Sequence, residues 1–239
     1  MTRPTELTAT DRTGTLFFAG LIWLLAFLAG LNEIATTDPG VPPVAPRLGE
    51  SVIAALIALA VVGLGVFVNA RVSHFRPSHA RRHVRLVLYA CLAGAAVGLV
   101  VLVQTLILAT FDDVLRHRYA VFVGESVWPP LLRAFSAGVI EEVTFRYVAM
   151  AAVALIAFRR FGNADRAYRV ALVSTSVVFG ILHFPGFSVA AVVVMLVNTA
   201  AALLFGWIYW HWGLPYAILA HFMGGLVNQS LGPRLIFLA

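Results

Sequence analysis

The stretch LLRAFSAGVIEEVTFRYVAMAAVALIAF, residues 131–158, decides how this chain must fold. It is long and apolar enough to cross the roughly 30 Å hydrocarbon core of a bilayer as one helix. Yet near its middle it contains two carboxylates, Glu141 and Glu142, and a guanidinium, Arg146. Each such charge near mid-membrane costs about 2.5–3.5 kcal/mol on insertion scales, so a span that keeps three of them favours a functional site.

The remainder of the chain has the composition of a membrane protein. Of its 239 residues, 61% are hydrophobic and 12% are charged, with a mean hydropathy of +0.90, whereas soluble domains carry about 25% charged residues. The formal charge is +6, but all 17 basic residues are arginines that lie mainly between apolar runs, which argues against nucleic acid as a partner. The single cysteine, Cys91, excludes a disulfide framework and a thiolate metal cluster.

Seven apolar runs predict an all-α fold, a polytopic bundle of seven to eight transmembrane helices. The runs cover residues 15–31, 51–69, 86–111, 131–158, 170–183, 187–210 and 214–231. The fourth run is long enough to hold a break or a short membrane-parallel helix, which would supply the eighth segment. Five arginines between residues 71 and 85 mark that connection as cytoplasmic. We expect a multi-pass protein of a bacterial plasma membrane, because arginine replaces lysine throughout.

The runs are expected to form a single membrane domain, with N-terminal spans in residues 1–130 and the ionisable spans in residues 131–239. Gly94 and Gly98 form a GxxxG motif in the third run. This spacing lets two helix backbones approach closely, so it predicts tight helix packing and says nothing about chemistry.

Helix geometry separates the two adjacent carboxylates. Glu142 and Arg146 stand at positions i and i+4, on one face and in the favourable order for an ion pair. Glu141 lies about 100° around the helix and is left without that partner. A desolvated acid that no cation neutralises is a candidate general base, so we assign catalysis to Glu141 and an orienting role to Glu142 and Arg146.

Two histidines belong to other predicted spans. His183 ends the fifth run, with Phe179 one turn before it, and His221 lies inside the seventh. Two histidines and a carboxylate from three helices could bind one zinc ion with an open fourth position, or could activate water without a metal. The residues alone leave both possibilities open, and we favour the chemistry without a metal cofactor.

These residues form a pattern that resembles a known family. EExxxR from Glu141 to Arg146, FxxxH from Phe179 to His183, and a third-motif histidine at His221 are similar to motifs of the CAAX prenyl-protease type II family. That family, with its bacteriocin-processing relatives, consists of intramembrane endopeptidases. The resemblance covers roughly residues 131–231, and it implies that Glu141 and His183 activate the water that attacks the scissile carbonyl. It further implies that His221 helps to stabilise the oxyanion.

The chain departs from the family at one position. The family's last motif reads HxxxN or HxxxD, but the fourth residue after His221 is Gly225. Loss of one oxyanion donor typically costs about 10² to 10³ in rate. Asn228 lies about 10 Å further along the helix than His221 and cannot simply replace the missing amide. Asn198, in the sixth run, is a second amide that could face the site or form an interhelical hydrogen bond.

The sequence therefore predicts an endopeptidase that hydrolyses a peptide bond of a membrane-associated peptide or protein near the surface of the lipid bilayer. It contains no HExxH, GxGD or GxSG motif of the other intramembrane proteases. Two alternatives remain. A non-catalytic immunity or scaffold protein of the same fold is favoured by Gly225, and a proton-coupled transporter is possible because buried ionisable residues also mark ion paths.

Overall fold

The computed structural model describes residues 60–72, 84–113, 116, 128–184 and 186–236, and these ranges contain helices and no strands. The labelled elements are α3 (Val84–Ala109), α5 (Trp128–Glu142), η1 (Val143–Met150), α6 (Ala151–Phe161), α7 (Ala164–Leu182), α8 (Val189–Trp212) and α9 (Leu214–Ile236). A further helix, Ala60–Val72, comes before them. The chain divides into two compact units, Met1–Phe67 and Val68–Ala239, and the labelled helices belong to the second. The predicted all-α class is confirmed for the described ranges.

The last five predicted spans all correspond to helices with slightly different ends. The first predicted span, 15–31, lies outside the described residues, and only residues 60–69 of the second are described. Among the described helices, α3 and α8 are long and apolar enough to cross a membrane. These two helices agree with a membrane protein, while the predicted count of seven to eight spans is not confirmed.

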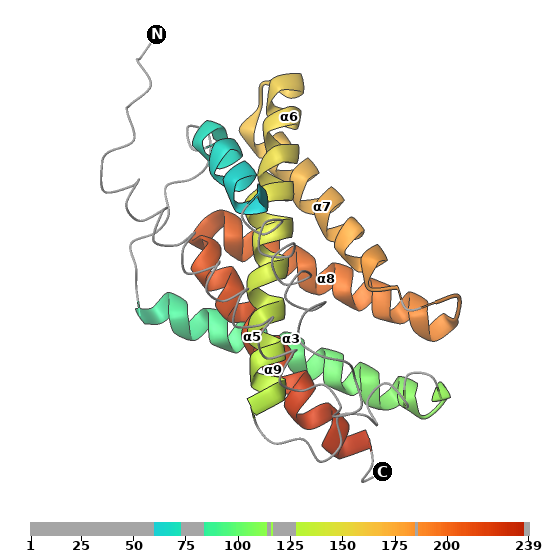
Figure 1. Cartoon of the computed structure of the whole chain (residues 1–239). Coiled ribbons are helices and arrows are strands. Elements are labelled where there is room, and N and C mark those ends of the chain that lie inside the picture. The colour runs from blue at the N-terminus through green and yellow to red at the C-terminus, as the bar shows by residue number, and fades with distance from the viewer. Residues whose placement is uncertain (1–59, 73–83, 114–115, 117–127, 185, 237–239) are drawn as a thin grey trace, which may run out of the picture. The chain divides into compact units, whose positions relative to one another are not determined.

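Helices α5, η1 and α6 form one continuous rod, drawn in yellow-green to yellow in Figure 1. Both junctions have right-handed helical backbone angles, with φ −69° and ψ −34° at Glu142 and φ −66° and ψ −40° at Ala151. Its central segment, η1, is a π-helix, a rare form that occurs most often at functional sites. The fourth run therefore contains a change of helical register where a break was considered, and this change begins directly after the paired glutamates.

Glycines allow α9 to approach two other helices at backbone distance. A Cβ atom added to Gly94 would collide with the carbonyl of Ala220, and one added to Gly98 would lie 2.6 Å from the carbonyl oxygen of Gly224. The matched order of these contacts makes α3 and α9 parallel. The tight packing predicted from GxxxG is confirmed, and its partner is the helix that contains His221.

The α7–α8 hairpin places His183 next to the rod. Asn163 begins α7 by accepting a hydrogen bond from the backbone N–H of Arg166 at 2.8 Å, as an N-cap residue does. At its other end, Gly180 lies against Met195 of α8, where an added Cβ would be 2.6 Å from the Met195 carbonyl oxygen. This close approach holds the end of α7, and therefore His183, in a defined position.

Candidate functional site

The rod places its two carboxylates in different environments. Glu142 and Arg146 are completely buried, and Arg146 Nε donates a hydrogen bond to Glu142 Oε2 at 3.1 Å. The side chain of Glu141 is 27% exposed. The predicted ion pair is thus present, and it leaves Glu141 outside, as the helix arithmetic indicated. Burying two charges is costly, and mutual pairing offsets that cost only when their geometry is good.

The second oxygen of Glu142 binds a residue that sequence reasoning did not connect with it. His221 Nδ1 lies 2.9 Å from Glu142 Oε1. Because a carboxylate only accepts hydrogen bonds, Nδ1 is the protonated nitrogen of this ring. Glu142 therefore links α5 to α9 and orients His221 while it also binds Arg146.

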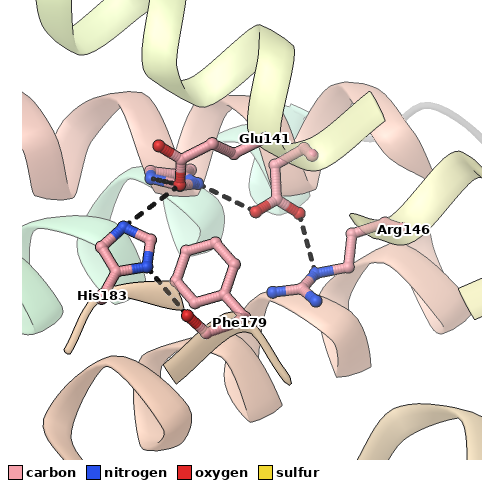
Figure 2. Close-up of polar contacts among 6 residues, drawn as sticks. Glu141, Arg146, Phe179 and His183 are labelled. Carbon is pink, nitrogen blue, oxygen red and sulfur yellow. Dashed lines mark hydrogen bonds and ion pairs between the residues drawn. The ribbon is translucent and has the colours of Figure 1, made fainter. Parts of the chain in front are cut away.

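His183 is oriented by the backbone of its own helix. Its Nδ1 donates to the carbonyl oxygen of Phe179 at 2.9 Å, as Figure 2 shows. Its ring stacks on Phe179, with 4.4 Å between the ring centroids and an angle of 26° between the planes. The FxxxH spacing has a direct physical reason here, because residues four apart on a helix are neighbours.

These constraints aim both imidazoles at one oxygen. The Nε2 atoms of His183 and His221 each lie 3.7 Å from Glu141 Oε2, and Figure 2 shows the contact of Glu141 with His183. This separation exceeds hydrogen-bond length, and Glu141 Oε2 has no direct hydrogen-bond partner. With Nδ1 protonated, each neutral ring offers a lone pair at Nε2. Three electron-rich atoms from three helices thus converge, and a proton or a water molecule between them would satisfy all three.

A metal ion is the other group that could take such a position. Carboxylate and imidazole are ligands that zinc prefers. However, within the described ranges no group of three or more His, Cys, Asp and Glu side chains has an arrangement that could hold a metal ion. Glu141, His183 and His221 are the residues that would hold such an ion, the choice between the two chemistries is tested by the chelation experiment below, and no step below is routed through a metal.

Aromatic rings surround the two histidines. Phe205 of α8 stacks on His221, with a centroid distance of 4.9 Å and an interplanar angle of 19°. Phe145 of η1 meets Phe179 edge to face at 5.0 Å, and the guanidinium carbon of Arg146 lies 5.4 Å from the centre of the Phe179 ring. Sequence reasoning selected Phe179 from its motif but missed Phe205, because a phenylalanine within an apolar span gives no signal of its own.

Position 225 faces the neighbouring helix. A Cβ atom added to Gly225 would lie 3.2 Å from the Cβ and 3.4 Å from the Cα of Ala134 in α5. Similarly, a Cβ added to Gly138 would lie 3.1 Å from the backbone nitrogen of Phe222. The two helices are therefore antiparallel and in close contact at this level. A side chain at position 225 would therefore require Ala134 to give way by a few tenths of an ångström at the first atom alone.

The two candidate amides have different placements. Asn198 Nδ2 donates to the carbonyl oxygen of Val194 at 2.8 Å. This hydrogen bond lies within its own helix, and it is neither of the two arrangements considered from the sequence, a position facing the site or a hydrogen bond to another helix. Asn228 is half-buried in α9, about two turns beyond His221.

Comparison with known proteins yields one match. Residues 123–227 match the model of the Rce1-like family, described as type II CAAX prenyl endopeptidase Rce1-like. The matched region contains every residue of the polar cluster, and it confirms the family resemblance derived from the three motifs. No curated protein and no solved structure matches the chain.

Proposed function

We propose that this membrane protein is an intramembrane endopeptidase with Glu141 as its general base, because residues 123–227 match the Rce1-like family of type II CAAX prenyl endopeptidases. The observation that carries the proposal is the convergence of Glu141 Oε2 with the Nε2 atoms of His183 and His221 at 3.7 Å each. The side chain of Glu141 is partly exposed although its Oε2 atom is buried, whereas the side chain of Glu142 is completely buried.

In the proposed reaction, a water molecule lies between Glu141 and His183. It donates one hydrogen bond to the Glu141 carboxylate and the other to His183 Nε2, so a lone pair on its oxygen points at the scissile carbonyl carbon. As the oxygen attacks, the water proton passes to Glu141, and the carbonyl oxygen becomes an oxyanion. Glu141 later returns this proton to the amine that leaves when the peptide C–N bond breaks.

His221 stabilises the oxyanion in the proposed reaction. In this proposal, Nε2 of a protonated His221 donates a hydrogen bond to the oxyanion, while Glu142 accepts from Nδ1 of the same ring and orients it. Arg146 donates to the other oxygen of Glu142 and so holds that carboxylate in position. The buried pair thus acts through His221, while Glu141 and His183 act on the water.

The test is cleavage of an internally quenched fluorescent peptide that ends in a farnesylated Cys-aliphatic-aliphatic-X sequence, by the full chain in proteoliposomes. General base catalysis contributes about 10² to 10⁴ in rate, so Glu141→Gln should lose activity by that factor. Asp165→Asn, which neutralises an exposed carboxylate in the first turn of α7, is the matched control and should retain full activity. Equal cleavage by wild type and Glu141→Gln would contradict the proposal.

Metal dependence is tested on the same preparation. The mechanism above expects cleavage to persist after dialysis against a strong chelator, with less than one zinc ion per chain by elemental analysis. Activity that disappears on chelation and returns with zinc would overturn the metal-free mechanism and leave the assignment as a protease intact.

A second function is favoured by one observation. Gly225 stands where the family motif has an asparagine or aspartate, and it lies close against Ala134. A member that has lost this donor could serve as a non-catalytic immunity or scaffold protein. A cellular effect of the wild-type protein that survives Glu141→Gln would support this function and contradict proteolysis.

A further inference from the structure

A polar link joins the end of helix Ala60–Val72 to the π-helical segment. Asn69 Nδ2 donates to the carbonyl oxygen of Tyr147 at 2.6 Å, and the Tyr209 hydroxyl donates to Asn69 Oδ1 at 2.9 Å. We propose that Asn69, oriented by Tyr209, is a positioning residue that holds η1 in its π-helical register and thereby places Arg146 and Glu142.

The first reason is the hydrogen bonding at the end of η1. In a regular α-helix the backbone N–H of Ala151 would donate to the carbonyl of Tyr147, four residues earlier. Here it donates to the carbonyl of Val148, three residues earlier, which is a 3₁₀-type bond that closes the C-terminal end of the π segment. Asn69 supplies a side-chain donor to the carbonyl from which this backbone N–H has turned away. Since a buried carbonyl needs a donor, the Asn69 amide lowers the free energy of the π register relative to the α register.

The second reason is the position of the link in the cluster. Tyr147 directly follows Arg146, which is completely buried and bonded to Glu142. A π turn contains about one residue more than an α turn. Conversion of the π turn to an α turn would therefore rotate the side chains that follow it by about 100° relative to those that precede it. Arg146 and Glu142 stand at i and i+4, a spacing that can also pair in an α-helix, so the register determines where the bonded pair lies and not whether it forms. Through Glu142, the register also affects the 2.9 Å contact to His221 Nδ1.

Tyr209 determines which end of the Asn69 amide faces Tyr147. Its side chain is only 1% exposed, and its hydroxyl is bonded to the oxygen of the Asn69 amide. A primary amide has one accepting and one donating end, so a donor at Oδ1 turns the NH₂ group toward Tyr147. Val68 and Val72, which flank Asn69 on the same helix, are buried as well. The amide is therefore held from both ends and has little freedom to flip.

This inference extends the site beyond the matched family region. Asn69 lies before residue 123, where the family match begins. A part of the chain that the family model does not cover would then determine how precisely the catalytic helix is built. The kinetic test of this idea rests on the proposed proteolysis, whereas the structural test does not.

The kinetic experiment compares two variants with one control in the full chain. Asn69→Leu should lower kcat by up to about 10²-fold with little change in KM, because a misplacement of about 1 Å can have that effect. Tyr209→Phe removes only the hydroxyl and should lower kcat about fivefold. Tyr168→Phe is the matched control, since the Tyr168 hydroxyl is buried without a hydrogen-bond partner among the described residues, and its kcat should not change.

The double variant Asn69→Leu/Tyr209→Phe separates positioning from general stability. If Tyr209 acts through Asn69, the double variant should have the kcat of Asn69→Leu alone. Independent, multiplicative losses would show that Tyr209 acts elsewhere and would overturn the ordered pair. Unchanged kcat in both single variants would overturn the proposal as a whole.

The structural experiment is an electron cryomicroscopy structure of Tyr209→Phe and of Asn69→Leu in nanodiscs. We expect the Ala151 N–H to return to the Tyr147 carbonyl and the contact between Glu142 and His221 to lengthen in Asn69→Leu, with a smaller change in Tyr209→Phe. An unchanged π segment in both variants would overturn the positioning role, even if the wild-type protein cleaves no peptide. If Asn69→Leu fails to fold, Tyr209→Phe alone decides by the same criterion.

Discussion

Two adjacent glutamates divide the polar centre into a closed half and an open half. In the closed half, Glu142 is fully buried and bonded to both Arg146 and His221. In the open half, Glu141 is partly exposed, and its Oε2 lies at 3.7 Å from two histidine nitrogens without a direct hydrogen bond. Glu142 therefore has a structural function, whereas the adjacent Glu141 is available to take part in a reaction. The difference arises from which face of the rod each one occupies.

The largest effect is expected when the carboxylate of the closed half, Glu142, loses its charge. Glu142→Gln leaves the Arg146 charge buried without its counterion, which should cost about 3–5 kcal/mol of unfolding free energy. Glu141→Gln should leave stability almost unchanged while it abolishes cleavage. Reversible unfolding in mixed micelles, monitored by circular dichroism, measures both variants. Equal stability of the two would show that the carboxylates are not functionally divided.

The pair itself can be tested with a double variant. Arg146→Met alone should also destabilise the protein, because Glu142 then lacks its strongest partner. The double variant Glu142→Gln/Arg146→Met removes both charges and should recover much of the stability lost by either single change. Additive losses in the unfolding measurements would show that the two groups do not form an energetically coupled pair.

A smaller loss of stability is expected when the packing of α3 against α9 is changed outside the site. Gly94→Ala introduces a methyl group against the Ala220 carbonyl, one residue before His221, and overpacking of this kind costs about 1–3 kcal/mol. Because α9 must shift, His221 moves relative to Glu142, and kcat should fall as well. Gly63→Ala is the matched control, since a Cβ at Gly63 meets nothing within 4 Å. A loss of stability in Gly63→Ala as large as that in Gly94→Ala would refute the packing explanation.

The smallest expected effect concerns the departure at position 225. Gly225→Asn restores the family residue, but its side chain meets Ala134, so we expect a modest loss of stability and no gain in kcat. Combining it with Ala134→Gly makes room and should recover the stability. A clear rise in kcat for Gly225→Asn alone would show that α5 yields easily and that the amide was the missing oxyanion donor.

Much of the fold and part of the site followed from local patterns. The apolar runs predicted the helices, because a membrane span must satisfy its backbone hydrogen bonds internally. The pairing of Glu142 with Arg146 followed from i, i+4 geometry, which operates within one helix and survives the π segment. GxxxG predicted a close helix contact, which occurs between α3 and α9.

Other features could not be read from local patterns, because they depend on atoms from different helices. The bond from His221 to Glu142, the stack of Phe205 on His221, and the contact of Gly225 with Ala134 each join two segments far apart in the chain. The π-helical register of η1 is also of this kind, since Asn69 contributes a donor to it from another helix.

The sequence by itself determined which residues carry charge in apolar runs, which of the two glutamates can pair with Arg146, and which family the motifs resemble. Only the tertiary structure decided that His183 and His221 meet at Glu141 Oε2, that their Nδ1 atoms are already occupied, and that position 225 is closed by α5. The physical reason is that helical periodicity determines direction within one helix. The distance between helices is determined by packing, and in this protein largely by small residues such as Gly94, where backbones come into contact.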